Sequence, residues 1–372
     1  MMKPKILFIM HTPPPVHGAA MMGQYIKDSK LINSQFDCIY INPSLSHKVS
    51  SVGKVNISKV GKLLGIYWKV FKKVVKEKPN LCYFTATCSG WGIIRDAAMV
   101  GLLKIFHRKI VLHLHNKGVR KLRGNKIADI IYRLMFKNVK VILLSEHLYE
   151  DVSQFVKHKD VYICPNGIPD TTGGVEPSAE RHNKIPHLLF LSNLIISKGV
   201  IVLLDALKIL KDRGYSFVCD FVGGETKEMD AARFNEEVRQ RGLNKMAIYD
   251  GKKFGEEKTK AYQQADVFVF PTYYEAFGLV NLEAMEQKLP VVSTTEGGIP
   301  DVIKDGENGV IAKRKDASSL ADGIAKLLGD KPLREKMGED GFRKFKEQFT
   351  VSAFERRLGN ILSDSIVSGR QQ

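Results

Sequence analysis

The chain has 372 residues, more than one ordinary hydrophobic core accommodates, so we expect two domains. Hydrophobic residues make up 44% and charged residues 26%, which is typical of a soluble globular protein. No run of about 18 apolar residues occurs, which excludes a membrane-spanning helix, and the short apolar run before His11 does not resemble a signal peptide. We therefore expect a cytoplasmic protein. Five scattered cysteines without a CxxC pair favour reduced thiols over disulfides or a zinc site.

The net charge of +17 is confined to the first half of the chain. Residues 1–170 contain 27 Lys and Arg against 10 Asp and Glu, which gives +17, whereas the remaining residues contain 30 of each and sum to zero. A basic half indicates an anionic partner, which is a nucleic acid, a membrane surface or a phosphorylated substrate.

Short apolar runs alternate with helical segments from the N-terminus to residue 168. Strands are predicted at residues 5–10, 37–41, 81–85, 109–114, 139–144 and 161–164. A helix is predicted from about Ala19, and residues 57–78 and 127–136 have the apolar spacing of further helices. Alternating strands and helices predict a parallel sheet with helices on both faces. Residues 1–168 therefore form the first predicted domain.

A second series of strands and helices follows a polar segment rich in Gly and Pro, residues 169–186, which is predicted to be a linker. Strands are predicted at residues 187–191, 216–222, 267–270 and 291–293, and helices at 199–213, 258–264 and 279–287. Only helices are predicted after residue 293. The second domain is predicted to span residues 187–350, and residues 351–372 to form a helix that packs back towards the first domain. Doubly wound domains bind ligands at the carboxyl ends of their strands, so a site between the domains is expected.

Residues 273–284, Tyr-Tyr-Glu-Ala-Phe-Gly-Leu-Val-Asn-Leu-Glu-Ala, place two glutamates eight positions apart around a predicted helix start. Glu275 follows a strand, Gly278 begins the helix, and Glu283 lies about one turn further along it. Backbone N–H groups at such a helix start suit an anion, and the two carboxylates suit hydroxyl groups. The spacing alone fits a surface glutamate beside an ordinary helix start equally well.

His113 and His115 alternate with leucines at the end of a predicted strand and therefore share one face of the sheet. No third ligand lies nearby in the sequence, so no metal is expected, and His113 is equally well a structural histidine. Gly18 joins the first strand to its helix, where a close backbone approach suits phosphate. A plain turn is the alternative interpretation of Gly18.

Residues 57–78 mix apolar and basic side chains at helical spacing. A helix lying on a membrane surface explains this pattern, and so does an ordinary helix with a solvated lysine face. The one-sided charge of the chain favours an anionic membrane, and no recognised nucleic-acid-binding module is present. The candidate membrane or acceptor contacts are Lys62, Lys69, Lys72, Lys73, Arg120, Lys121 and Arg123.

Several motifs in the same order resemble glycosyltransferase family 4, whose signature is E-x7-E inside an E-x-F-G-L-x-x-x-E-A frame. The chain has Glu275-Ala276-Phe277-Gly278-Leu279 and then Glu283-Ala284. Further matches are Ser145-Glu146, Pro165-Asn166-Gly167, Ser197-Lys198-Gly199-Val200 and the segment from Gly297 to Gly309, so the resemblance extends over most of the chain. By contrast, no GxGxxG, GxxxxGK[ST] or HExxH motif occurs, which weakens dehydrogenase, nucleoside-triphosphatase and zinc-hydrolase interpretations. The resemblance implies a GT-B fold, with two Rossmann-like domains facing each other across a cleft.

The resemblance also implies how a nucleotide-sugar would be held. Glu275 would contact hydroxyl groups of the transferred sugar, and Glu283 would hold the ribose. The backbone groups of Phe277, Gly278 and Leu279 would face the sugar and the diphosphate.

Three further matches concern the phosphate groups and the reacting sugar. Lys198 would neutralise the diphosphate leaving group, Gly18 would lie beside the phosphates, and His115 would lie beside the sugar. The family often has an arginine where this chain has Asn193, whose amide donates a hydrogen bond but brings no charge.

The implied activity is transfer of a sugar, with retention of configuration, from a UDP- or GDP-sugar to a glycan or a phosphorylated or lipid-linked acceptor. The expected context is the synthesis of surface polysaccharides or glycoconjugates by a protein bound to the inner face of the plasma membrane. His115, Lys198 and Glu275 are the predicted catalytic residues, and no metal, other cofactor or nucleic acid is expected. The alternatives are a GT-B sugar-nucleotide epimerase, which needs no acceptor, and a non-catalytic binding protein at the membrane surface.

Overall fold

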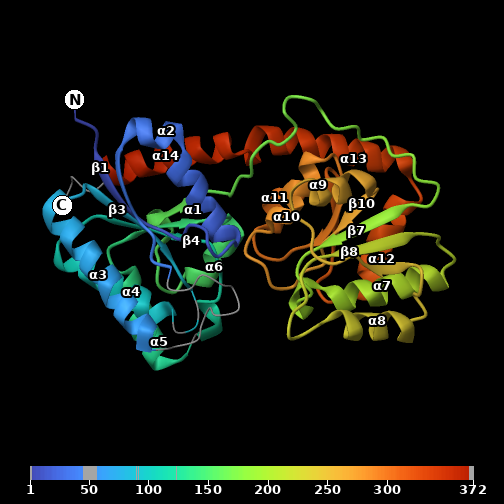
Figure 1. The fold of residues 1–372 in the computed structure, drawn as a ribbon, viewed down its shortest axis with the longest axis horizontal. Coiled ribbons are helices and arrows are strands. Elements are labelled where there is room, and N and C mark those ends of the chain that lie inside the picture. Colours follow the sequence, from blue (N-terminus) through green and yellow to red (C-terminus); the bar gives the residue numbers. More distant parts are fainter. Residues whose placement is uncertain (1, 45–56, 89, 91, 123, 368–372) are drawn as a thin grey trace. The chain divides into compact units, whose positions relative to one another are not determined.

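The computed structural model describes residues 2–44, 57–88, 90, 92–122 and 124–367 (Figure 1). Its contacts divide the chain into two compact units, one formed by Met1–Gly167 with Val351–Gln372 and the other by Ile168–Thr350. Each unit contains a six-stranded parallel sheet covered by helices, which confirms the predicted α/β fold class. In the part of the chain that the structure describes, no helix has the length and apolar character needed to cross a bilayer.

The sheet of the first unit has the strand order β2-β1-β3-β4-β5-β6. Its strands are β1 (Lys5–Ile9), β2 (Asp37–Ile41), β3 (Leu81–Ala86), β4 (Ile110–Leu114), β5 (Lys140–Leu143) and β6 (Val161–Ile163). Its α-helices are α1 (Gly18–Asp28), α2 (Lys30–Gln35), α3 (Ile57–Glu77), α4 (Gly92–Ile105), α5 (Lys126–Phe136), α6 (Tyr149–Val152) and α14 (Val351–Val367). All six strands lie within a residue or two of the predicted positions, because each is a short apolar run that the sheet buries.

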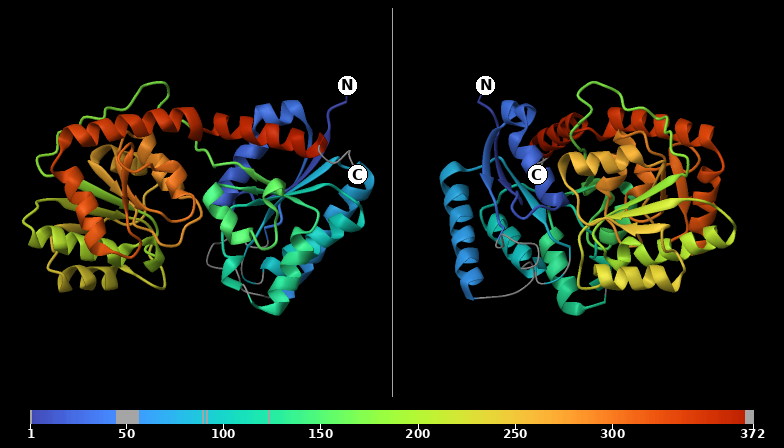
Figure 2. Two further views of the ribbon diagram at one scale, coloured as in Figure 1. Left: turned by 180° about the vertical axis from the view of Figure 1, so that it is seen from behind. Right: turned by 45° about the vertical axis from the view of Figure 1, so that its right-hand side comes forward.

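Helices α3, α4 and α5 lie side by side on one face of this sheet, and α1, α2 and α14 lie on the other (Figures 1 and 2). The connections through α3, α4 and α5 all step in the same direction across the sheet, so right-handed crossovers place them on the same face. On the opposite face, Phe8 and Tyr83 of the sheet share a core with Phe354 and Leu358 of α14. The segment after residue 350 is therefore part of the hydrophobic core of the first unit.

The sheet of the second unit has the strand order β12-β11-β10-β7-β8-β9. Its strands are β7 (His187–Leu191), β8 (Val218–Val222), β9 (Ala247–Tyr249), β10 (Val267–Val269), β11 (Val291–Thr294) and β12 (Gly309–Ala312). Its α-helices are α7 (Val200–Asp212), α8 (Ala231–Gln240), α9 (Gly255–Gln264), α10 (Leu279–Glu286), α11 (Ile299–Val302), α12 (Ala317–Leu328) and α13 (Lys331–Lys344).

The prediction of helices alone after residue 293 was wrong, because β12 adds a strand to the edge of the second sheet. β12 has only four residues and begins at Gly309, which opposes Val291 in the parallel register. A Cβ atom at Gly309 would lie 2.3 Å from the carbonyl oxygen of Val291. Val310 and Ile311 favour a strand, but two β-branched residues between Gly309 and Ala312 are too short a run to indicate one, and β12 forms where β11 supplies the pairing edge.

The predicted linker segment belongs by its contacts to the second unit. The backbone N–H and the hydroxyl of Thr171 donate to Oε1 of Glu286 over 2.5 Å and 2.9 Å. Further along, the guanidinium of Arg181 donates to the carbonyl oxygens of Ala265 (3.0 Å) and Gln287 (2.8 Å). These hydrogen bonds fix the segment to the surface of the unit.

Candidate active site

Glu275 lies in the loop between β10 and α10, at the carboxyl end of the second sheet. Its Oε1 accepts hydrogen bonds from the backbone N–H groups of Ala276 (2.8 Å) and Phe277 (3.4 Å). Its own backbone N–H donates to Oε1 of Glu296 over 3.3 Å. Glu296 is fully buried, and its Oε2 lies 2.7 Å from Nη1 of Arg314. Backbone and carboxylate of Glu275 are therefore both held in place.

Lys198 reaches the same carboxylate from a different element. Its Nζ lies 2.7 Å from Oε2 of Glu275 and 3.2 Å from the carbonyl oxygen of Tyr274. Lys198 ends a 3₁₀ turn, and α7 starts after Gly199 (φ +91°), one residue later than the predicted start at residue 199. A Cβ atom at Gly199 would lie 2.3 Å from the carbonyl oxygen of Pro271, so glycine is what lets this turn approach the Glu275 loop.

Glu283 lies on α10 and is held by two side chains of α9. Its Oε1 is 2.6 Å from Nζ of Lys258, and its Oε2 accepts the hydroxyl of Tyr262 over 2.8 Å. Burial, followed by the nearby charge of Glu283, raises the pKa of Tyr262 well above its ordinary value, so the hydroxyl keeps its proton. Glu283 is therefore an anchored, partly exposed carboxylate with a cation and a hydroxyl as partners.

Gly278 is the N-cap of α10 and has φ +80°, a left-handed conformation that favours glycine. A Cβ atom there would lie 2.9 Å from Nδ2 of Asn281, so the position also lacks space for a side chain. The ring of Phe277 is buried and packs against Phe349 at a centroid distance of 6.2 Å. Leu279, the first residue of α10, is half-buried. Backbone groups, rather than side chains, are what this turn can present to a ligand.

Asn193 follows β7, at the same edge of the sheet as Glu275. Its Oδ1 accepts the backbone N–H of Gly224 over 3.1 Å. With the oxygen engaged, the amide N–H groups are the donors that this side chain can offer to an anion.

In the first unit, His113 and His115 lie on one face at the end of β4, with ring centroids 4.1 Å apart. Nδ1 of His113 is 2.6 Å from the hydroxyl of Tyr83, a buried contact that favours the structural interpretation of His113. Both ring nitrogens of His115 are buried and have no hydrogen-bond partner among the residues that the structure describes. Burial lowers the pKa of His115 to about 3 and the pKa of His113 well below its ordinary value. Both imidazoles are therefore neutral at pH 7.

Two further histidines, which the sequence motifs did not single out, lie beside Gly18 in the loop between β1 and α1. Nδ1 of His17 accepts the backbone N–H of Ala20 over 3.3 Å and so caps α1, whose first residue is Gly18. Nδ1 of His11 is 3.0 Å from the hydroxyl of Ser44, and burial lowers the pKa of His11 to about 4. The position of His17 directly before a predicted helix could have indicated an N-cap, but histidine is not among the residues that usually cap helices.

Over residues 2–44, 57–88, 90, 92–122 and 124–367, no group of three or more His, Cys, Asp or Glu side chains is placed to hold a metal ion. The metal independence of the reaction stays a prediction.

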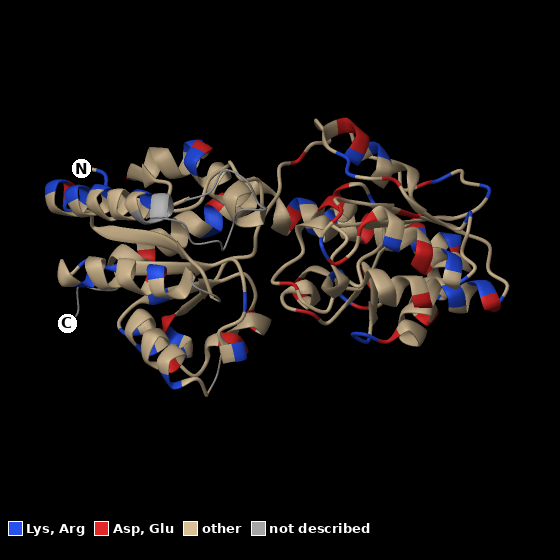
Figure 3. Ribbon diagram, turned by 60° about the horizontal axis from the view of Figure 1, so that its bottom comes forward, with Lys and Arg blue, Asp and Glu red and all other residues tan. Residues whose placement is uncertain are grey.

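The predicted membrane or acceptor contacts lie in the first unit, and six are exposed there: Lys62, Lys69, Lys72, Lys73, Arg120 and Lys121. Nζ of Lys72 lies 5.1 Å from the centre of the Trp68 ring. Arg120 forms an ion pair with Glu150, and Arg123 lies outside the described residues. Figure 3 shows Lys and Arg in blue along the helices of this unit.

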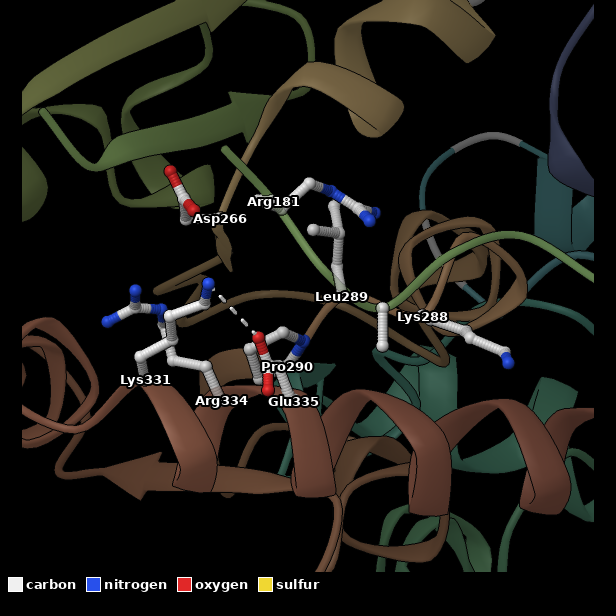
Figure 4. A pocket seen from close by; sticks show the side chains of 9 residues that line it. Arg181, Asp266, Lys288, Leu289, Pro290, Lys331, Arg334 and Glu335 are labelled. Atoms are coloured by element: carbon white, nitrogen blue, oxygen red, sulfur yellow. Dashed lines mark ion pairs between the residues drawn. The ribbon is translucent and has the colours of Figure 1, made fainter. Parts of the chain in front are cut away.

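A small hollow in the second unit lies at the opposite end of the sheet from Glu275 (Figure 4). Asp266 and Pro290, which line it, immediately precede β10 and β11, whereas Glu275 follows β10. Lys331 and Glu335 on its rim form an ion pair of 3.6 Å. Because open α/β sheets bind ligands at the carboxyl ends of their strands, this hollow is not the candidate active site.

Comparison with known proteins agrees with this geometry. Residues 176–344 match the model of the family "Glycosyl transferases group 1". The chain is 25% identical over 305 residues to D-inositol 3-phosphate glycosyltransferase of Corynebacterium aurimucosum, which covers 76% of this chain and 70% of the relative. It is also 25% identical over 274 residues to the capsular polysaccharide biosynthesis glycosyltransferase CapM of Staphylococcus aureus, covering 68% and 70%.

A solved structure extends the likeness to both units. The structure of HepE from Anabaena in complex with UDP superposes with a TM-score of 0.74 at 17% identity, and the match covers 97% of this chain and 100% of HepE. The predicted GT-B fold and family are thereby confirmed. The chain belongs to the glycosyl transferases group 1 family, glycosyltransferase family 4, and it is a glycosyltransferase of GT-B fold.

Proposed function

We propose that this glycosyltransferase moves a sugar from a UDP- or GDP-sugar to a glycan or lipid-linked acceptor in the synthesis of surface polysaccharides or glycoconjugates. The contact between Lys198 and Glu275, beside the start of α10, carries the proposal, since it joins a cation for a diphosphate to a carboxylate for sugar hydroxyls. The UDP in the HepE structure and the role of CapM in capsular polysaccharide biosynthesis support it.

The donor binds to the second unit in this proposal. Glu275 accepts hydrogen bonds from sugar hydroxyls, and the backbone turn at Gly278 faces the diphosphate, towards which the helix dipole of α10 is favourable. Glu283, fixed by Lys258 and Tyr262, accepts hydrogen bonds from the ribose. Phe277 and Leu279 contribute their backbone groups to the same turn.

Catalysis then consists of stabilising the departing diphosphate. Lys198 exchanges the Glu275 carboxylate for a phosphate oxygen, and the amide of Asn193 donates a further hydrogen bond without adding charge. The bond from the sugar to the phosphate oxygen breaks while the acceptor oxygen bonds to the sugar on the same face, and the leaving phosphate oxygen takes the proton of the acceptor hydroxyl, so configuration is retained. In this proposal Lys198 supplies the positive charge for the diphosphate, and no metal or other cofactor takes part. Glu275 positions the sugar and forms no covalent bond to it.

The acceptor binds to the first unit, where the positive charge is concentrated. His115 lies beside the transferred sugar as a neutral imidazole, and Gly18 lies beside the phosphates. A phosphorylated or lipid-linked acceptor suits the basic residues of this unit, and we place the protein on the inner face of the plasma membrane.

The test is release of nucleoside diphosphate from UDP- and GDP-sugars, with and without acceptor, by the wild type and by Glu275→Ala. We expect Glu275→Ala to lose turnover severely while the protein stays folded. Glu257→Ala, an exposed glutamate on α9, is the matched control and should keep full activity. Near-normal turnover by Glu275→Ala would refute the assignment, and so would conversion of the donor sugar without any release of nucleoside diphosphate.

A further inference from the structure

The helices α3, α4 and α5 carry large apolar side chains on their solvent side. Among the residues that the structure describes, eight of the fifteen exposed large hydrophobic side chains belong to these three helices: Leu64, Trp68, Val75, Ile94, Ile105, Ile127, Ile130 and Leu134. We call these eight residues the outer apolar face. Single exposed hydrophobic residues are normal, but a concentration on three adjacent helices marks an interaction surface.

α3 has two apolar faces and a basic flank between them. At about 100° per residue, Leu64, Trp68 and Val75 fall within about 40° of one another, and they are 66%, 56% and 45% exposed. The buried residues Ile66 and Val74 lie on the side facing the sheet, roughly 140° away from this stripe. The lysines fill the arc on one side between the two faces: Lys62, Lys69, Lys72, Lys73 and Lys76.

α4 and α5 repeat the outward apolar orientation. On α5, Ile127, Ile130 and Leu134 fall within about 60° and are 71%, 59% and 63% exposed. On α4, Ile94 and Ile105 fall within about 20° of each other and are 50% and 71% exposed. Because the three helices lie side by side on one face of the sheet (Figures 1 and 2), their outward stripes point to the same side of the unit.

On the other flank of α3, the stripe continues towards α4. Phe71 stacks on Trp68 with ring centroids 5.1 Å apart and meets Phe106, which follows α4, at 5.7 Å. The hydroxyl of Tyr67 donates to the carbonyl oxygen of Arg95 on α4 over 2.6 Å. These contacts hold the two helices together and make their outward apolar side chains one rigid surface.

The segment that carries the outer apolar face also carries most of the charge of the protein. Residues 57–137 contain 18 Lys and Arg against 3 Asp and Glu, which gives +15 of the total +17. One of the three acids, Asp96, is buried and paired with Arg95 at 2.6 Å. A surface this basic repels a second copy of itself, and exposed apolar residues among lysines complement a bilayer of anionic lipids.

We propose that the outer apolar face docks onto an anionic lipid bilayer, with its apolar side chains entering the headgroup boundary and the lysines of α3 meeting lipid phosphates. This docking adds a membrane partner to the proposed function. It rests on the proposed function only in assuming that the acceptor resides in the membrane. Docking by this face holds the acceptor-binding unit at the surface where such an acceptor resides.

The experiment measures binding of the purified full-length protein to sedimented vesicles and the fluorescence of Trp68. The vesicles contain phosphatidylcholine alone or with a minority of phosphatidylglycerol. The chain has two tryptophans, so Trp91→Phe makes Trp68 the only one. We expect binding to the anionic vesicles that weakens with salt, together with a blue shift of Trp68 emission and its quenching by brominated lipid chains.

Two pairs of substitutions separate the apolar from the electrostatic part. Ile130→Ser with Leu134→Ser should lower the partition coefficient about tenfold or more without removing its salt dependence. Lys62→Glu with Lys69→Glu should lower it about a hundredfold at low salt. The matched controls lie in the second unit and should change nothing: Val175→Ser with Ile185→Ser, both exposed, and the exposed Lys326→Glu.

Absence of binding to anionic vesicles, or binding without any change in Trp68 emission, would overturn the proposal. An Ile130→Ser/Leu134→Ser variant that binds like the wild type would do the same. Tighter binding to single-stranded RNA than to vesicles, lost only in the lysine variants, would replace the membrane with a nucleic acid. Vesicle binding needs no donor, and donor turnover in detergent needs no vesicle, so failure of either proposal is recognised separately.

Discussion

Nζ of Lys198 and Oε2 of Glu275 lie 2.7 Å apart, and the two side chains are 20% and 21% exposed. The cation and the carboxylate that are proposed to bind different parts of the donor thus neutralise each other in the free protein. Both side chains keep part of their surface in contact with solvent, and we expect a bound diphosphate to replace the carboxylate as the partner of Lys198.

We therefore expect Lys198→Ala to lower turnover about a hundredfold or more while the protein stays folded, with a loss of about 1–3 kcal/mol of stability. The loss in turnover reflects the missing charge on the leaving group. Release of nucleoside diphosphate measures the first effect and thermal unfolding the second. Lys313→Ala, an exposed lysine of the same unit, serves as the control. An active Lys198→Ala enzyme would show that the leaving group is stabilised by other residues.

The ion pair between Glu296 and Arg314 fixes the carboxylate that accepts the backbone N–H of Glu275. Arg314→Ala leaves the buried Glu296 carboxylate without its cation and should cost about 2 kcal/mol in stability. Glu296→Gln keeps an acceptor for the backbone N–H of Glu275 and should cost less.

We also expect the Arg314→Ala enzyme to have a raised KM for the donor, because the loop that carries Glu275 is loosened. Arg213→Ala, which breaks the surface ion pair with Asp322 (2.6 Å), is the control and should have little effect on either quantity. Equal stability of the Arg314→Ala and Arg213→Ala proteins would contradict the supporting role of Glu296.

Gly278 and Gly306 offer a matched pair of substitutions, since their φ angles are +80° and +78°. Alanine at either position costs about 1 kcal/mol of backbone strain. Only at Gly278 does the added Cβ meet a neighbour, Nδ2 of Asn281 at 2.9 Å, whereas at Gly306 nothing lies within 4 Å. We expect Gly278→Ala to destabilise the protein further and to lose donor affinity, measured by thermal unfolding with and without UDP. Equal behaviour of the two variants would exclude a special role for the α10 start.

The buried His11 should make the protein less stable in mild acid. Burial, then the charges of Arg95 and His17, lower its pKa from 6.5 to about 4, so the unfolded chain binds this proton more readily than the folded chain. The resulting stabilisation is present above about pH 6.5 and is lost as the pH falls towards 4; by about pH 5 the loss is on the order of 2 kcal/mol.

Melting temperatures at about pH 7.5 and pH 5 test this expectation. The decrease between the two should be smaller in His11→Asn than in the wild type by about 4–8 °C. His182→Asn, an exposed histidine of the second unit, should leave the decrease unchanged. An equal decrease in His11→Asn and the wild type would exclude His11 as the source.

The fold was predictable where burial sets a simple period. β1 and β7 are apolar runs bounded by polar residues, and their positions agree with the predicted strands at 5–10 and 187–191. β12 was not predicted, because it is stabilised by pairing with the neighbouring β11 at the edge of the sheet. The spacing of apolar residues in the sequence does not indicate such pairing. α7 begins one residue after the predicted start, because Gly199 is its N-cap and has a left-handed conformation, φ +91°.

Spacing within the sequence indicated the site only where its residues lie close together, and Lys198, 77 residues from Glu275, was connected to it only through the family resemblance. Glu275, Gly278 and Glu283 share one motif, so their spacing indicated a site. Lys258 pairs with Glu283 from 25 residues away, and Arg314 pairs from 18 residues away with Glu296, which accepts the backbone N–H of Glu275. Nothing in local spacing connects these partners. Long-range ion pairs follow from strand order in the sheet, which is a property of the folded chain.

The membership of α14 in the first unit has a consequence for protein engineering. Because Phe354 and Leu358 complete the core built on β1 and β3, a fragment that stops at residue 167 would expose that core to water. A chimera that exchanges the first unit between relatives therefore needs two crossover points, one near Gly167 and one near Thr350. A chimera with a single junction would combine the first sheet of one parent with helix α14 of the other.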